Sequence, residues 1–105
     1  MEIKEHAFEE TGLLTLFEEN SDKMDVRFGT VTIPPGERVP NQGLSKHEEN
    51  EYSLIIQGKI EGESGGKPFS VSESNATLIP AGEEHWAINS GDQPCKIVWV
   101  LVKEK

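Results

Sequence analysis

Two short segments on either side of a glycine-rich turn hold the residues best suited to chemistry. The first runs from His47 to Glu51, and the second contains His85. Side chains alternate between the two faces of a β-strand, so Ser45, His47 and Glu51 share one face if this stretch is extended. His85 can then meet them from a neighbouring strand. Two imidazoles and a carboxylate at these spacings predict a site for one metal ion.

The predicted ligands suit a particular class of ion. Imidazole nitrogens and carboxylate oxygens bind divalent first-row metals, and two histidines with one carboxylate leave positions open for a substrate or dioxygen. The set resembles the facial arrangement of non-haem iron enzymes. We therefore predict a divalent transition metal (Fe, Mn, Ni or Zn) held by His47, Glu51 and His85. Glu51 is also the candidate catalytic residue, because a carboxylate can move protons.

Other acidic residues and a third histidine surround these positions. Taken singly, each is more often a solvated surface group than a ligand, and it is the pairing of the two spacings that favours a site. His6 has no such partner nearby and is expected to be exposed. The acidic residues expected on solvated loops are Glu48, Glu49, Glu83 and Glu84.

The elements that must position these groups are short strands. Glycine and proline interrupt the sequence at short intervals, and the runs between them are rich in β-branched and aromatic residues. This pattern predicts an all-β fold with sandwich or barrel topology. Only residues 8–14 would allow a turn of helix. The expected strands are residues 13–17, 24–33, 52–57, 69–71, 76–79, 86–89 and 96–102.

The same alternation predicts which side chains share the inner face with Glu51 and His85. They form a small pocket of mixed polarity, which favours a small molecule over a polymer as the ligand. The predicted pocket residues are Ser45, Ser53, Ile55, Ala87 and Asn89.

The outward faces are also apolar. Trp86 and Ile88 would point outward, and Ile97–Val102 is a run of apolar residues that would favour aggregation unless both faces were covered. A second copy of the chain is the most economical cover. We therefore predict a homodimer that packs sheet against sheet through Trp86, Ile88 and part of Ile97–Val102. The alternative is that the N-terminal segment of the same chain covers this face.

Length and charge limit the remaining possibilities. A chain of 105 residues predicts a single domain, with a short N-terminal strand segment at 1–20 and a barrel core at about 24–103. A net charge of -9 opposes binding to nucleic acid or to an anionic membrane. Without an apolar run of membrane-spanning length, the expected location is cytoplasmic. Cys95, the only cysteine, is expected to be a small packing residue.

At the two segments the chain resembles the cupin superfamily. The first family motif runs, in outline, His-x-His, a few residues, Glu, six residues, Gly. The second runs Gly, five residues, Pro-x-Gly, two residues, His, three residues, Asn. Ser45-Lys46-His47, Glu51 and Gly58 fall on the places of the first, and Pro80, Gly82, His85 and Asn89 match the second. The resemblance covers about the central half of the chain. It implies a small single-domain cupin with an RmlC-like double-stranded β-helix, or jelly-roll barrel.

Two departures from the family pattern bear on the metal. Ser74 stands where the second motif usually opens with glycine, and Ser45 stands where the family usually has its first histidine. Cupins generally hold their metal with three histidines and a glutamate. The resemblance thus implies that water, substrate or Gln42 fills the fourth place here, with lower affinity than a four-ligand site.

The resemblance implies a metal-dependent enzyme that acts on a small molecule as a dioxygenase, isomerase, decarboxylase or lyase. No residue chooses among these reactions. Two alternatives stay open: a non-catalytic cupin that binds or senses a small molecule or sugar, and a metal-free degenerate cupin. Ser45 is the best argument for the last.

Overall fold

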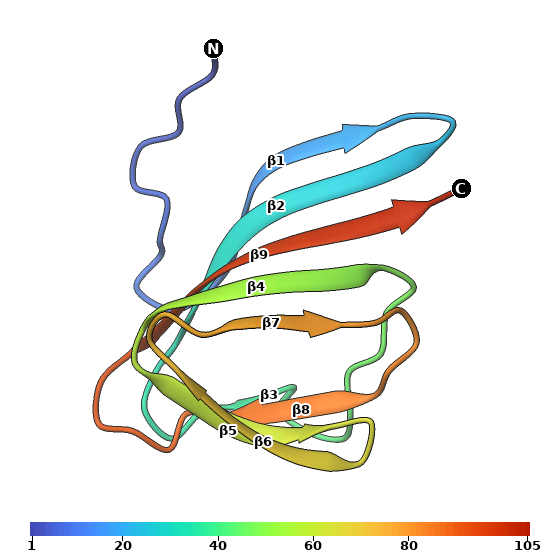
Figure 1. Cartoon of the computed structure of the whole chain (residues 1–105). Helices are drawn as coiled ribbons and strands as arrows, with labels where there is room; N and C mark the ends of the chain where they lie inside the picture. The colour runs from blue at the N-terminus through green and yellow to red at the C-terminus, as the bar shows by residue number, and fades with distance from the viewer.

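The computed structural model describes residues 1–105 as an all-β protein (Figure 1). Its strands are β1 Gly12–Asn20, β2 Met24–Ile33, β3 Arg38–Val39, β4 Asn50–Gln57, β5 Lys59–Ser64, β6 Lys67–Ser72, β7 Ala76–Ile79, β8 His85–Ile88 and β9 Cys95–Glu104. No helix is present that is long and apolar enough to cross a membrane. The predicted all-β class is confirmed.

The strands form two antiparallel sheets that face each other as the upper and lower layers of Figure 1. One sheet has the order β1-β2-β9-β4-β7, and the other has the order β3-β8-β5-β6. Strands that are consecutive in the chain repeatedly change sheet, as from β4 to β5 and from β6 to β7. This is the jelly-roll arrangement that the resemblance implied.

The alternation of side chains along β4 follows the prediction. Ile55 is almost fully buried, whereas Tyr52, Leu54 and Ile56 are exposed. The inward side chains of β2, β4, β5 and β9 build a core between the sheets. Its buried members are Ile33, Ile55, Ile60, Cys95 and Ile97.

Cys95 lies inside this core and is fully buried. Burial raises the pKa of its thiol from 9.0 to about 11. Because the thiolate is the reactive form, we expect no labelling by a disulfide reagent at pH 8 in the folded protein and rapid labelling in denaturant. The folded-state pKa is the higher one, so the neutral thiol's contribution to stability is present below pH 9 and lost as pH rises towards 11. Rapid labelling under native conditions would contradict the burial.

The N-terminal segment contains the strand expected at residues 13–17, as part of β1, but not the helical turn that residues 8–14 would allow. Residues 8–14 form no helical turn, and β1 begins at Gly12. Instead, the carbonyl of Ala7 accepts a hydrogen bond from the Thr30 hydroxyl, and that of Glu9 accepts one from Thr32 at 2.9 Å. These bonds tie the segment to the outer side of β2. The carbonyls of Ala7 and Glu9 are therefore used by the threonine hydroxyls and not by a helix.

The residues predicted to form the homodimer interface lie on two different sheets. Trp86 and Ile88 belong to β8 in the four-stranded sheet, whereas Ile97–Val102 belongs to β9 in the five-stranded sheet. The outer faces of two packed sheets point in opposite directions, so a single interface cannot contain both groups. The N-terminal segment covers part of the outer side of β2, while Tyr52, Leu54 and Ile56 of β4 stay exposed. The homodimer stays a prediction.

Candidate metal centre

Backbone hydrogen bonds bring the two motif segments together at one end of the barrel. The amide of Ser45 donates to the carbonyl of His85 at 2.8 Å, and the amide of His85 donates back to Ser45 at 2.9 Å. The amide of Gly82 donates to the carbonyl of His47 at 2.7 Å. The predicted meeting of His85 with the first segment therefore rests on main-chain pairing.

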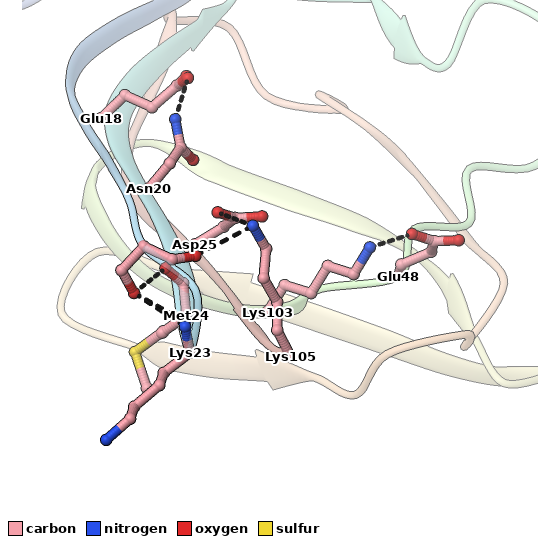
Figure 2. A network of polar contacts seen from close by, with 9 residues as sticks. Glu18, Asn20, Lys23, Met24, Asp25, Glu48, Lys103 and Lys105 are labelled. Atoms are coloured by element: carbon pink, nitrogen blue, oxygen red, sulfur yellow. Dashed lines mark hydrogen bonds and ion pairs between the residues drawn. The ribbon is translucent and has the colours of Figure 1, made fainter.

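The loop that carries His47 is also held by charged side chains. Lys103 on β9 donates a hydrogen bond to Glu48 at 2.7 Å, as Figure 2 shows. This hydrogen bond, together with the lysine charge, lowers the pKa of Glu48 and correspondingly raises the pKa of Lys103. Arg27 on β2 lies 3.6 Å from Glu49. Lys103 thus holds the residue that follows His47 through a hydrogen bond, and Arg27 adds a longer ionic contact.

His47 is the shared neighbour of the other two candidate ligands. Its Nε2 lies 3.8 Å from Oε1 of Glu51, and both side chains are only about a quarter exposed, at 26% and 23%. Its ring meets that of His85 edge to face, with the centroids 4.9 Å apart and the planes at 71°. The three residues that the spacing predicted are therefore close together in space.

The ring of His85 is oriented by the backbone. Its Nδ1 lies 3.0 Å from the carbonyl oxygen of Glu83. A carbonyl only accepts hydrogen bonds, so Nδ1 carries the proton in the neutral ring and Nε2 keeps a free lone pair. Histidines that bind metals through Nε2 are commonly oriented in this way.

Two imidazoles and a carboxylate are donor types that suit a divalent transition metal. They contact one another in two pairs, His47 with Glu51 and His47 with His85. As they stand, however, no three His, Cys, Asp or Glu side chains in the chain converge closely enough to hold a metal ion. Ser45 lines the cavity beside these residues, whereas Gln42 is exposed and lies outside the cavity wall. The structure brings the candidate ligands together around His47 without joining them into one cluster.

A cavity of about 570 Å³ opens beside the candidate ligands. Its wall includes His47, Glu51 and His85, and 15 of its 26 lining residues are hydrophobic. The space is therefore more apolar than the mixed pocket that the sequence predicts. Four of the predicted pocket residues also lie in the wall: Ser45, Ser53, Ile55 and Ala87.

Asn89 is the one predicted pocket residue that the structure places outside the cavity wall. It is fully buried and does not line the cavity. Its amide group donates to the carbonyls of Ile33 and Gln93 at 2.8 and 2.9 Å, and its side-chain oxygen accepts from the Gly91 amide at 2.9 Å. Asn89 follows the end of β8, and these bonds draw it into the backbone that joins β8 to β9. The side chain of Asn89 thus holds the loop between β8 and β9 against the end of β2.

Sequence reasoning missed some residues of the cavity wall, notably Arg27 and Trp99. Trp99 lies in a strand with apolar residues on both faces, so alternation alone does not reveal which face points inward. For Arg27 a usable signal is that it shares one face of β2 with Val31 and Ile33, at every second position of the strand.

Comparison with known proteins places the chain in a family. The cupin domain family matches residues 29–101. Among curated proteins, a mannose-1-phosphate guanylyltransferase from Escherichia coli is 32% identical over 68 residues, which are 65% of this chain but only 14% of that protein. The chain therefore spans a small part of the length of this relative.

Solved structures agree on the fold. The cupin domain of Cnp3 from Schizosaccharomyces pombe has a TM-score of 0.72 and 17% identity, over 89% of this chain and 64% of that one. A predicted oxalate decarboxylase from Thermotoga maritima has a TM-score of 0.65 and 19% identity, over 90% and 94% of the two chains. Two facing antiparallel sheets, the paired motif segments and the family match over residues 29–101 lead to one conclusion: the chain belongs to the cupin family.

Proposed function

We propose that this cupin binds a divalent transition metal through His47, Glu51 and His85 and acts on a small molecule held in the adjoining cavity. The observation that supports this most is the position of His47, 3.8 Å from Glu51 and with its ring 4.9 Å from that of His85. All three side chains line the same cavity wall. No other part of the chain combines imidazole and carboxylate groups in this way beside a cavity.

Different residues of the chain would orient the metal ligands, accept a proton and exclude water at such a site. When bound, a divalent metal supplies Lewis-acid polarisation of a ligand oxygen. The backbone carbonyl of Glu83 keeps the proton of His85 on Nδ1, which leaves the lone pair of Nε2 free for a metal. Glu51 can accept a proton at a carboxylate oxygen. The apolar wall limits water around the bound molecule.

Metal titration of single-site variants tests the proposal. Wild-type protein is expected to bind about one ion per chain from Fe²⁺, Mn²⁺, Ni²⁺ or Zn²⁺, measured by calorimetry and by elemental analysis. His47→Ala and His85→Ala are each expected to weaken binding by about 100-fold or more, because losing a ligand should cost at least as much as losing a group that orients one.

His6→Ala is the matched control, since His6 is the third histidine of the chain and is exposed on the N-terminal segment. It should bind metal as wild type does. Circular dichroism should show that all variants fold. Equal metal binding by His47→Ala and wild type would refute the proposal.

A second candidate function is binding of a small molecule without a metal. The lack of three converging donors and the serine at position 45 favour it. In that case His47, Glu51 and His85 would hydrogen-bond the ligand. Wild-type protein would then bind no ion after reconstitution, and the titration above distinguishes the two functions.

A further inference from the structure

A cationic side chain lies on the inner face of the barrel in the same cross-strand row as Glu51. Arg27 on β2 pairs with Leu101 on β9, and Leu101 pairs with Glu51 on β4. All three line the cavity. Neighbouring strands lie about 4.8 Å apart, so the backbones of Arg27 and Glu51 are separated by roughly 10 Å. A small molecule can span that separation.

The guanidinium of Arg27 is weakly engaged by the protein. Its ionic partner is Glu49, and the Nη2 to Oε2 distance of 3.6 Å is longer than a hydrogen bond. The Arg27 side chain is 43% exposed. A guanidinium carries five N–H donors arranged to bind a carboxylate through two parallel hydrogen bonds. Arg27 therefore has donors to offer to a ligand at the rim of the cavity.

The cavity beyond Arg27 is suited to an apolar group. Its wall includes Val31, Phe69 and Leu101. It also includes Trp99, whose indole N–H is buried without a hydrogen-bond partner in the protein. A ligand that fills this space would thus place carbon against most of the wall and its charged group at the rim.

The charge of the ligand follows from the charges around it. The chain carries a net charge of -9, and Glu49, Glu51 and Glu83 all lie near or in the cavity wall. Arg27 and Lys67 are the only arginine and lysine in the wall, so the cations there are few beside these carboxylates, and a ligand with one negative charge is repelled less than a ligand with two. A monoanionic carboxylate therefore fits better than a dianionic phosphate.

We propose that Arg27 anchors the carboxylate of a small organic acid whose apolar part fills the cavity. This inference names the substrate class for the same cavity and in that sense rests on the proposed function. Arg27 acts as a specificity-determining residue in the recognition of the acid. Glu49 competes with the bound carboxylate for the guanidinium.

Binding of three matched probes tests this inference. Hexanoate, hexanamide and hexyl phosphate share one apolar chain and differ in the charged group. Their binding can be measured by calorimetry and by the fluorescence of Trp99, which lines the cavity. Wild type should bind hexanoate about tenfold more tightly than hexanamide, and hexyl phosphate no more tightly than hexanoate.

Substitutions assign the preference to one side chain. Arg27→Gln should bind hexanoate and hexanamide equally, whereas Glu49→Gln should strengthen hexanoate binding a few-fold by removing the competitor. Arg38→Gln is the matched arginine control, because Arg38 stacks on Trp86 at 4.7 Å and does not line the cavity. It should keep the full preference.

Three outcomes would overturn the inference. One is a preference for hexanoate that survives in Arg27→Gln. Another is its loss in Lys67→Gln, since Lys67 is the other cation in the cavity wall. The last is hexyl phosphate binding at least tenfold more tightly than hexanoate.

Repeating the titrations on chelator-treated protein separates this inference from the metal proposal. A carboxylate preference that depends on Arg27 without added metal would support the anchor even if the metal proposal failed. A preference that depends on added metal and not on Arg27 would support the metal proposal and overturn the anchor.

Discussion

Gly62→Ala is expected to lower the free energy of unfolding by about 3 kcal/mol, because β5 and β8 approach too closely at this position for a side chain. A Cβ atom built on Gly62 would lie 2.0 Å from the carbonyl oxygen of Trp86 and 2.8 Å from Cα of Ala87. Both are backbone atoms of β8, so no side-chain rotation relieves the overlap. The strand itself must shift.

The shift would reach the candidate metal centre. Gly62 pairs with Ala87, and two residues further along β5 Ser64 pairs with His85. Any Gly62→Ala protein that folds should therefore also bind metal more weakly than wild type. Urea denaturation followed by circular dichroism measures the first effect, and metal titration measures the second.

Gly66→Ala is the matched control in the same β5–β6 hairpin. Gly66 has a positive φ of 78° and nothing within 4 Å of a built Cβ. Its replacement should cost only the backbone strain, about 1 kcal/mol. Equal destabilisation by the two substitutions would show that close packing of β5 on β8 is not what requires glycine at position 62.

Asn89→Ala is expected to lower the free energy of unfolding by about 3 kcal/mol as well. The substitution removes three hydrogen bonds, one buried and two partly buried, and each such bond contributes about 1 kcal/mol. The partner groups in these bonds belong to Ile33, Gln93 and Gly91. Urea denaturation again measures the change.

Asn75→Ala provides the comparison, because Asn75 accepts one hydrogen bond from the Ser72 amide in an exposed turn. Its loss should cost less than about 1 kcal/mol. In the folded fraction, Asn89→Ala should bind metal and hexanoate as wild type does. A large loss of ligand binding with unchanged stability would place Asn89 in the site after all.

The two predictions share a structural basis. The candidate site lies on a barrel whose halves are joined by main-chain contacts, as between Ser45 and His85, and by buried polar groups such as Asn89. Figure 2 shows two ion pairs near the end of the five-stranded sheet: Lys105 lies 3.0 Å from Asp25, and Lys103 lies 2.7 Å from Glu48. The Lys103–Glu48 pair is exposed, so we expect it to position the loop of His47 more than to stabilise the fold.

The sequence determined the fold class and the identity of the candidate ligands. Strand alternation is a local property of the chain, so the inward position of Ser53 and Ile55 follows from that of Glu51 without knowledge of any neighbour. The turn at Pro80–Gly82 and the spacing to His85 are local in the same sense. The ranges expected for β2 and β7 agree with those in the structure.

The tertiary structure decided which strands lie beside one another and what each residue meets there. β5 was not predicted, because its Lys, Glu and Gly residues have low strand propensity, and only the approach of β8 explains Gly62. Asn89 is buried as alternation predicts, but its side-chain amide hydrogen-bonds the surrounding backbone and does not line the cavity. Arg27 comes into the row of Glu51 only through the register of β2, β9 and β4. Register joins residues that are far apart in the chain, and no local pattern specifies it.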